Sequence, residues 1–567
     1  MKEMSDQTRG IIFVVIVIAI TFAWMHFFQP PVPPPKPVSP AVQTAPAQTG
    51  GSKAATGTAV PAAPANPVLT KPVQAQGETN LVVESTVYHV ELSNRGGVVR
   101  SWKLKKYLDE ESPPRPLDLV NPDAAQELGW PFSLVLADKQ LEAEANSALY
   151  EMTPSTESAP APVQVTFHWS DGHLDVTKKL NFPQDYQLSV EVSVTLDGKP
   201  LPATVAWRGG FGDRAAFRES QYVSVFYKQN GKLNTLAFKK LGTPGNQIEP
   251  LEQAGPMEYA GIQDQFFAAT FIPDGTDIAL WDWGQWHHSS VNGQQVSDPQ
   301  AEMAVGAMNP GLVKLRAYVG PKDLALLGKV HPSLEELVQF GWFGVIAKPL
   351  LFVLEWMHKY IPNYGWTIVI FTLLLTMALL PIRIWTFHSA RKMQMVAPEV
   401  KAIQDKYKKY SMSDPRKRKM NEEVMAVYQR EGINPLGSCL PMLVQLPILM
   451  GFYRMLQGSI ALRHAPWIWW IHDLSAKDPY WVLPILMVIT SYFMTKMTPT
   501  PTASADPAQQ KMMALMPVFM GFIFINLSSG LNLYYFTSNL IGVVQQWYLN
   551  RSQPLPSRSK FRGKKKE

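Results

Sequence analysis

The sequence is poor in cysteine and in charge. One cysteine among 567 residues excludes a fold held by disulfides and any zinc site built from several thiolates of this chain. Charged residues make up 17% of the chain, below the ~25% of typical soluble domains, whereas the hydrophobic share of 46% is ordinary. Low charge at ordinary hydrophobicity predicts that the apolar residues are gathered into long runs. The length allows up to about four domains.

Motifs for catalysis or nucleotide binding are missing or weak. Ser389–Lys392 matches the S-x-x-K pattern of some hydrolases, but a four-residue match arises easily by chance. Gly209–Gly212 lacks the Lys-Ser/Thr that completes a phosphate-binding loop, which favours an ordinary turn. The adjacent His287 and His288 are typical of a solvated loop. We therefore predict that the protein is not an enzyme and has no catalytic residues, metal or cofactor.

The net charge of +6 is concentrated in two segments. Residues 383–435 hold 12 basic and six acidic residues, and residues 550–567 hold seven basic residues and one acidic residue. Basic segments next to membrane spans normally stay on the cytoplasmic side. If the chain spans a membrane, both segments are therefore expected in the cytoplasm.

An N-terminal transmembrane anchor is predicted over residues 1–29. Ile11–Phe28 is an 18-residue apolar run, long enough to span a bilayer, and its only polar members are Thr21 and His26. A cleaved signal peptide is the alternative, but the run ends without a small-x-small cleavage site. We expect an uncleaved anchor with a cytoplasmic N-terminus. Residues 30–78, rich in proline and alanine, are predicted to be an extended linker.

Residues 79–330 carry the alternation of β-strands. Apolar and polar side chains alternate through Asn80–Tyr107 and Val163–Leu196, as in strands with one buried face. Glycine-containing turn sequences separate the alternating stretches. No long helical period appears before about residue 320. The pattern predicts a large extracytoplasmic β-sandwich domain.

Residues 331–362 are predicted to form an amphipathic helix that lies flat at the extracytoplasmic surface of the membrane. Ser333 is a suitable N-cap for this helix. A spanning helix would bury Lys348 near its middle at a cost of about 3 kcal/mol. It would also place the basic segment 383–435 outside, against the positive-inside rule. An interfacial location avoids both problems.

Five further apolar segments complete a predicted α-helical polytopic membrane bundle with six transmembrane helices. This arrangement places a helical hairpin over 384–434 and the tail over 550–567 in the cytoplasm. Two apolar runs, Tyr480–Met494 and Met512–Leu527, are shorter than the ~20 residues that a bilayer requires. The five predicted spans are residues 363–383, 435–458, 480–497, 511–528 and 530–549.

The hairpin has a periodicity of its own. Its apolar residues recur at spacings of three and four, the pattern of a heptad seam between two antiparallel helices. They are Met393, Val396, Val400, Ile403, Tyr407 and Tyr410 before the loop, and Met420, Val424 and Val427 after it.

Polar side chains recur on one face of the last predicted span. They are Asn532, Tyr535, Asn539, Gly542 and Gln546, at spacings of three and four. Three other spans add Thr372, Thr376, Gln445 and Thr495. Polar groups inside a membrane normally face the bundle interior or a water-filled cavity. We predict a hydrophilic groove lined by these residues, with hydrogen bonds that only pack helices together as the alternative for each residue alone.

The most specific motifs lie between about residues 340 and 550. They are Asn434–Pro441, Gln445–Ile448, Leu462–Pro466, Trp470–Ser475, Asp478–Tyr480, Leu483–Leu486 and Ser529–Tyr535. Together they resemble the YidC/Alb/Oxa family of membrane protein insertases. The N-terminal anchor and the large outer β domain resemble the YidC of Gram-negative bacteria.

The resemblance implies a function and a set of partners. It implies insertion of nascent membrane proteins into the cell inner membrane, alone or with the Sec translocon, through a groove open to cytoplasm and lipid. It also implies ribosome contact through the basic tail and the hairpin, a lipid bilayer as surroundings, and no DNA partner. A solute transporter or channel is the runner-up, although no inverted repeat is apparent. A glycan-binding envelope protein is the third reading, because Trp281, Trp283 and Trp286 offer stacking surfaces.

One position departs from the family pattern. Many members carry a basic residue five positions before the proline that ends the first core span, and that position is Thr376 here. We predict that Arg383 supplies a substitute cation to the groove. On a helix it lies within about 20° of Thr372 and Thr376 and about 10.5 Å below Thr376, and a long side chain can extend upward. The alternative is an interface anchor that a kink at Pro381 turns away.

Overall fold

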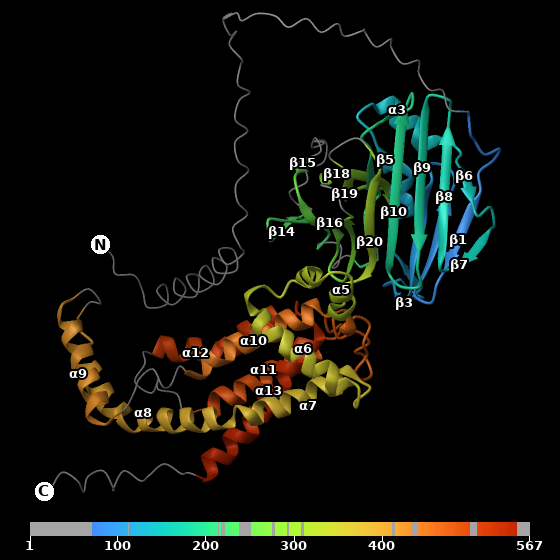
Figure 1. Ribbon diagram of the computed structural model, residues 1–567. Coiled ribbons are helices and arrows are strands. Elements are labelled where there is room, and N and C mark those ends of the chain that lie inside the picture. The colour runs from blue at the N-terminus through green and yellow to red at the C-terminus, as the bar shows by residue number, and fades with distance from the viewer. Residues whose placement is uncertain are drawn as a thin grey trace, which may run out of the picture. The chain divides into compact units, whose positions relative to one another are not determined.

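The computed structural model describes residues 71–552 with short gaps. The gaps are residue 112, residue 214, and residues 217–221, 238–250, 275–277, 292–293, 308–310, 411–413, 433–439 and 499–506. The predicted anchor, most of the predicted linker and residues 553–567 of the tail lie outside the described residues. The chain divides into two compact units (Figure 1): one holds residues 66–364 and 449–475, and the other holds 365–448 and the residues from 476 on.

Three sheets make up the β domain of the first unit. The first sheet has the order β4 (Pro116–Asp118), β3 (Val98–Leu108), β2 (Tyr88–Ser93), β1 (Asn80–Glu84) and β7 (Ser158–Pro160). The second has the order β14 (Lys232–Ala237), β13 (Ser224–Gln229), β16 (Met257–Gln263), β17 (Phe267–Pro273), β20 (Val313–Pro321), β10 (Gln187–Leu196), β9 (Leu174–Phe182), β8 (Val163–Ser170) and β6 (Glu151–Thr153), with β11 (Lys199–Pro200) paired to β10.

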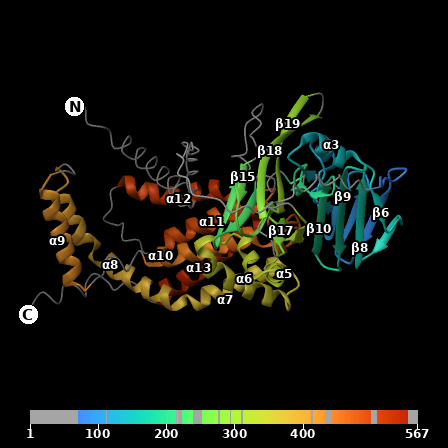
Figure 2. The ribbon, with the colours of Figure 1, turned by 45° about the horizontal axis from the view of Figure 1, so that its top comes forward.

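The third sheet carries the longest strands. Its order is β15 (Leu251–Ala254), β18 (Ile278–Val291), β19 (Gln294–Ala307), β12 (Thr204–Trp207) and β5 (Leu134–Val135). The β18–β19 hairpin extends beyond the neighbouring strands (Figure 2). The domain is therefore β-rich, as the alternation predicts.

Burial follows the sequence alternation. Along β10, every second residue from Leu188 to Val194 is buried. The first two sheets meet at Trp102, whose ring centroid lies 5.8 Å from that of Tyr88 and 6.1 Å from that of Phe182. Burial of such aromatic side chains supplies much of the stability of a sandwich core.

A buried lysine connects segments distant in sequence within this core. Lys178 of β9 is 1% exposed, and its Nζ donates to the carbonyl oxygens of Gly96 (2.7 Å), Gly97 (3.1 Å) and Phe132 (2.9 Å). Burial lowers the pKa of Lys178 to about 7. Gly96 and Gly97 have φ of 76° and 56°, which lets their carbonyl groups turn inward.

Two short helices that the strand alternation did not predict interrupt the strands. α2 (Pro122–Leu128) starts where the Asn121 side chain accepts from the Ala124 N–H at 3.3 Å. α3 (Lys139–Ser147) starts where Asp138 accepts from the N–H groups of Gln140 and Leu141. Side-chain oxygens at these positions satisfy amides that have no partner within the helix.

The segment after the β domain differs from the predicted continuous helix. It consists of α5 (Leu324–Val330), the 3₁₀ turns η2 (Pro332–Leu337) and η3 (Gly341–Phe343), and α6 (Gly344–His358). The prediction that Ser333 caps a helix is wrong, because its Oγ donates to Glu258 Oε2 at 3.0 Å and makes no cap bond. Lys348 pairs with Glu335 at 2.9 Å, so its charge has an exposed partner.

Seven α-helices follow within the described residues. They are α7 (Tyr364–Ala378), α8 (Leu380–Lys406), α9 (Arg416–Arg430), α10 (Leu440–Gly458), α11 (Val482–Met497), α12 (Pro507–Phe524) and α13 (Ser529–Ser552). By length and composition, none of the described helices alone meets the requirement for a membrane span, whereas α7 and α8 meet it together as a pair bent by 55°.

Helices α8 and α9 pack through the predicted heptad positions. Met393, Val396, Val400 and Val427 are buried in one cluster, against which Ile403 and others pack. At the far end of the pair, Tyr407 donates to Glu423 at 2.7 Å. The apolar contact is narrow, and charged residues cover the remaining surface.

Candidate functional site

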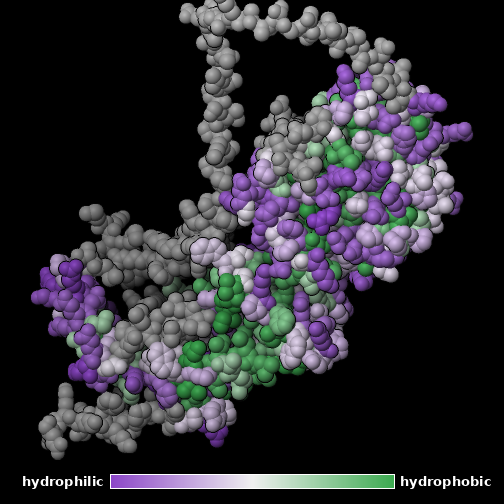
Figure 3. All heavy atoms as spheres, viewed as in Figure 1, coloured by the Kyte–Doolittle hydropathy of each residue, from purple (hydrophilic) through white to green (hydrophobic). Residues whose placement is uncertain are grey.

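The helices of the second unit expose large apolar side chains. On the face shown in Figure 3, hydrophobic residues gather over the helices, whereas the β domain is mainly polar. The exposed residues include Ile370, Leu374 and Met377 of α7, Ile485, Ile489 and Phe493 of α11, Leu515 and Phe522 of α12, and Leu540, Val544 and Trp547 of α13. A soluble protein rarely exposes so many apolar residues together. The pattern is typical of helices that contact lipid.

Polar side chains of α13 face α11. Asn539 Nδ2 donates to Ser491 Oγ at 2.6 Å, and Asn550 Nδ2 donates to the Met497 carbonyl oxygen at 3.0 Å. Gln546 is 6% exposed and donates to Asn550 Oδ1 at 3.2 Å. These bonds run along the polar face that the spacing of α13 predicts.

Arg383 points toward this same polar face. Its Nη1 donates to Gln545 Oε1 of α13 at 3.0 Å. Gly542 leaves the space for the guanidinium, since a Cβ there would lie 2.8 Å from Nη1. The alternative required a kink at Pro381 that turns Arg383 away. The break between α7 and α8 does not do this, because Arg383 contacts α13.

Thr372 and Thr376 lie on a buried face of α7. Thr372 is 0% exposed and donates to the Ile368 carbonyl oxygen at 2.6 Å, while Thr376 is 4% exposed and donates to the Thr372 carbonyl oxygen at 2.8 Å. Each hydroxyl bonds within its own helix, which is how threonines enter apolar helices at low cost. The hydroxyl hydrogens of Thr372 and Thr376 are therefore used within α7 and are not offered to groups outside it.

Gln445 and Tyr535 make different contacts. Gln445 Nε2 lies 3.5 Å from the hydroxyl oxygen of Tyr534, the residue before Tyr535. The ring of Tyr535 packs against Phe524, with centroids 5.0 Å apart. Gln445 therefore joins the polar contacts of α13 through a residue that the stripe did not include.

Asn532 does not line an open space. It is 0% exposed, and its Nδ2 donates to the carbonyl oxygens of Phe524, Leu527 and Ser528 at 3.0–3.3 Å. Phe524 is the last residue of α12, and Leu527 and Ser528 lie in the turn that leads to α13. The Asn532 side chain therefore joins the end of α12 to the start of α13, and its predicted groove role stays a prediction. Thr495 is half-buried and donates to the Ser491 carbonyl oxygen at 2.8 Å.

Three residues of this network escaped the sequence prediction. Gln545 sits one position before a stripe residue, Tyr534 sits one position before another, and Ser491 lies four residues before Thr495 on α11. The spacing rule selected one narrow face of α13, whereas Arg383 and Gln445 approach from adjacent directions. A wider polar arc on the helix was the available signal.

Two family models together match most of the chain. The model described as the YidC periplasmic domain matches residues 80–353, and the one described as a 60Kd inner membrane protein matches residues 356–556. The boundary between the two matches falls within α6.

Curated relatives match over nearly the whole length. A membrane protein insertase YidC of Geobacter metallireducens is 31% identical over 96% of this chain and 98% of its own. One of Geotalea uraniireducens is 32% identical over 97% of this chain and all of its own. A crystal structure of an active YidC insertase covers 85% of this chain and 96% of its own, at 18% identity and a TM-score of 0.35. With that identity over that length, the chain belongs to the YidC family of membrane protein insertases.

Proposed function

We propose that the protein inserts nascent membrane proteins into the cell inner membrane, with its β domain in the periplasm. The proposal rests on the second unit, the helical unit, which exposes apolar side chains and buries polar ones, the reverse of a soluble domain. Its helices expose apolar residues and turn polar ones, Arg383 and Asn539 among them, toward one another. The protein is not an enzyme, and the insertion needs no bond-making step.

Membrane insertion has a cost that such a polar face reduces. A substrate segment that crosses hydrocarbon carries backbone groups without partners, each costing several kcal/mol. A hydrophilic groove lined by Arg383, Gln445, Thr495, Tyr535 and Asn539, with Thr372 and Thr376 buried in its wall, offers hydrogen bonds part of the way. The apolar segment of the substrate then leaves sideways into lipid, where burial of its side chains drives the process.

The lengths of two helices support the same proposal. α11 has 16 residues and α12 has 18, so they extend about 24 Å and about 27 Å. Both values fall below the ~30 Å hydrocarbon thickness, and short helices thin the bilayer beside them. A thinner bilayer shortens the path that polar substrate atoms must cross.

The topology belongs to the proposal as well. We infer six spanning helices, with the anchor 1–29 first and α7, α10, α11, α12 and α13 at the predicted spans. Both termini and the hairpin 384–434 then lie in the cytoplasm, which agrees with their basic charge. The exposed Trp342, Val345 and Phe352 of the segment 331–362 suit an outer interfacial location.

Partners follow from the same charge distribution. The basic tail and hairpin have the charge needed to bind ribosomal RNA phosphates. The Sec translocon is a further proposed partner for substrates with large outer domains.

The test is complementation in cells depleted of their own insertase. Expression of this chain should restore insertion of small single-span proteins, measured by protease accessibility of their outer segments. Solute flux into proteoliposomes made with the purified protein should match that of empty liposomes. Flux without restored insertion would favour a transporter and contradict the proposal.

A glycan-binding role finds no support in the described residues. Trp281 is half-buried and packs against Ala206 and Ala304 of the third sheet. The side chains of Trp283 and Trp286 lie outside the described residues.

A further inference from the structure

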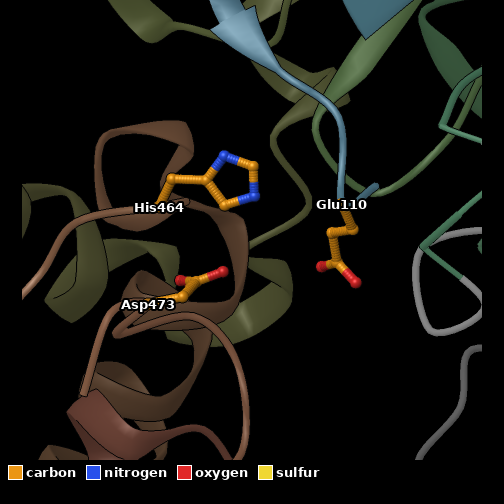
Figure 4. Close-up of side chains that lie close together, drawn as sticks. All are labelled: Glu110, His464 and Asp473. Carbon is orange, nitrogen blue, oxygen red and sulfur yellow. The ribbon is translucent and has the colours of Figure 1, made fainter. Parts of the chain in front are cut away.

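A cluster of possible metal ligands lies where the β domain meets the connection between α10 and α11. Glu110 lies in the turn between β3 and β4, and His464 and Asp473 lie in the connection (Figure 4). One ligand atom from each residue lies within 4.8 Å of the other two. Figure 4 shows the three side chains directed toward the same space. The family motifs explain neither Glu110 nor the grouping.

Hydrogen bonds to backbone groups hold His464 and Asp473 in place relative to each other. The Leu474 N–H donates to the Ala465 carbonyl oxygen at 3.0 Å, which aligns Asp473 beside His464. Asp473 Oδ1 also accepts from the Ser475 N–H at 2.7 Å, which fixes one carboxylate oxygen and leaves the other for a ligand bond.

A buried ion pair joins the connection to the turn that carries Glu110. Arg463 Nη2 lies 2.7 Å from Asp213 Oδ2, and their side chains are only 2% and 1% exposed. The same Asp213 oxygen accepts from the Glu110 N–H at 2.9 Å. Arg463 also donates to the Leu108 carbonyl oxygen. The three ligand residues therefore stand on a rigid frame.

We propose that Glu110, His464 and Asp473 bind a divalent transition-metal ion, with zinc as the best match. One imidazole and two carboxylates are ligands that zinc uses, whereas calcium and magnesium prefer oxygen alone. Two carboxylates balance the charge of the ion. The ion would fasten the β3–β4 turn to the α10–α11 connection, so this site replaces the expectation that the protein holds no metal.

The neighbouring cations do not cancel the negative charge of the site, because they are paired with other carboxylates. Arg463 is neutralised by Asp213, and its guanidinium stacks over the Phe267 ring at 5.5 Å. Arg115 pairs with the two carboxylates that flank Glu110, those of Asp109 and Glu111.

A small adjustment completes the geometry. Ligand atoms about 2.1 Å from a tetrahedral zinc ion lie about 3.4 Å apart. The present separations of up to 4.8 Å must therefore shorten by up to about 1.4 Å. Glu110 is the exposed member of the three, so its side chain is the one that we expect to move.

The experiment is calorimetric titration of the full chain, purified in detergent without a histidine tag and stripped with chelator, using ZnCl₂. One equivalent should bind. Glu110→Gln, His464→Gln and Asp473→Asn should each weaken binding by about tenfold or more. Matched controls are Glu111→Gln, His472→Gln and the double variant His287→Gln/His288→Gln, which should bind like the parent.

A second readout keeps the test decisive if a variant folds poorly. Cobalt bound in place of zinc should give visible absorption bands that disappear in Glu110→Gln, a change on an exposed turn. Absence of zinc binding by the parent chain would overturn the proposal. So would unchanged binding by Glu110→Gln and His464→Gln, or loss of binding only in the His287/His288 variant.

Discussion

The β domain and the helical unit bury opposite kinds of side chain. Among the described residues before 340, only Leu108, Tyr222 and Leu312 are large apolar residues with exposed side chains, whereas many follow from Trp342 on. The β domain buries its aromatic residues, and the helical unit turns polar residues inward. This difference is the one expected of a chain with water around its sandwich and, as proposed above, lipid around its helices.

Buried charges show the same contrast. In the β domain and the connection they have several partners, as Lys178 and the Arg463–Asp213 pair do. In the helical unit most of the buried polar residues described are uncharged, apart from Asp478, which accepts from the Leu483 N–H, and Arg383 supplies a cation beside α13. The first arrangement stabilises a fold, and the second is the one that we propose for contact with a substrate.

The largest stability effect should come from breaking the buried ion pair. Asp213→Ala leaves Arg463 buried without a carboxylate, which should lower the free energy of unfolding by about 3–5 kcal/mol. Loss of β-sheet circular dichroism on heating measures the change. Arg115→Ala removes only exposed pairs and should cost about 1 kcal/mol or less. Equal effects of the two variants would mean that the buried pair does not stabilise the domain.

A smaller loss is expected from Lys178→Met. The variant leaves three buried carbonyl groups without a donor and should lower stability by about 3 kcal/mol at pH 7. Lys179→Met, on the exposed side of β9, is the matched control and should change stability little. Heat unfolding of the three proteins gives the comparison.

The Lys178 effect should also depend on pH. Its pKa falls from 10.5 to about 7 on folding, so between these values the unfolded chain holds a proton that the folded chain has lost. The stability of the parent relative to Lys178→Met should therefore rise from pH 7 to pH 9. A constant difference across this range would show that burial does not lower the pKa.

The smallest effect should come from the basic tail. Removing residues 553–567 leaves α13 complete and deletes six of the seven basic residues of the tail. Co-sedimentation with ribosomes should fall at low salt, while the fold and membrane orientation stay the same. Unchanged co-sedimentation would assign ribosome binding to other parts of the chain or exclude it.

The sequence predicted periodic features well. Alternation in β9 and β10, and the heptad residues of α8 and α9, follow from which face is buried. The spacing of polar residues in α13 likewise predicted that Asn539 and Gln546 lie on one polar face.

Features that depend on a distant partner could not be predicted. Asn532 caps α12, and that role exists only because α12 ends beside it. Ser333 bonds Glu258 instead of its own helix, a partner 75 residues away. Gln545 gains its role from Arg383, 162 residues earlier. Spacing along one helix carries no information about such partners.

The most direct measurement is insertion of a single-span substrate with an acidic outer segment by Arg383 variants, in cells depleted of their own insertase. The central claim is that a cation on the α13 polar face assists the substrate. Arg383→Ala should reduce insertion by about tenfold, since charged hydrogen bonds contribute about 1.5–3 kcal/mol. Arg383→Lys should retain most insertion, and Ile382→Ala, on an exposed neighbour, should insert normally.

A rescue completes this measurement. Thr376→Arg added to Arg383→Ala should restore insertion, because Thr376 lies on the buried face of α7, just before the bend that leads to Arg383 on α8. Leu375→Arg, about 100° round the helix, should not restore it. Normal insertion by Arg383→Ala, or equal rescue by Leu375→Arg, would contradict the claim that a cation on this face assists insertion.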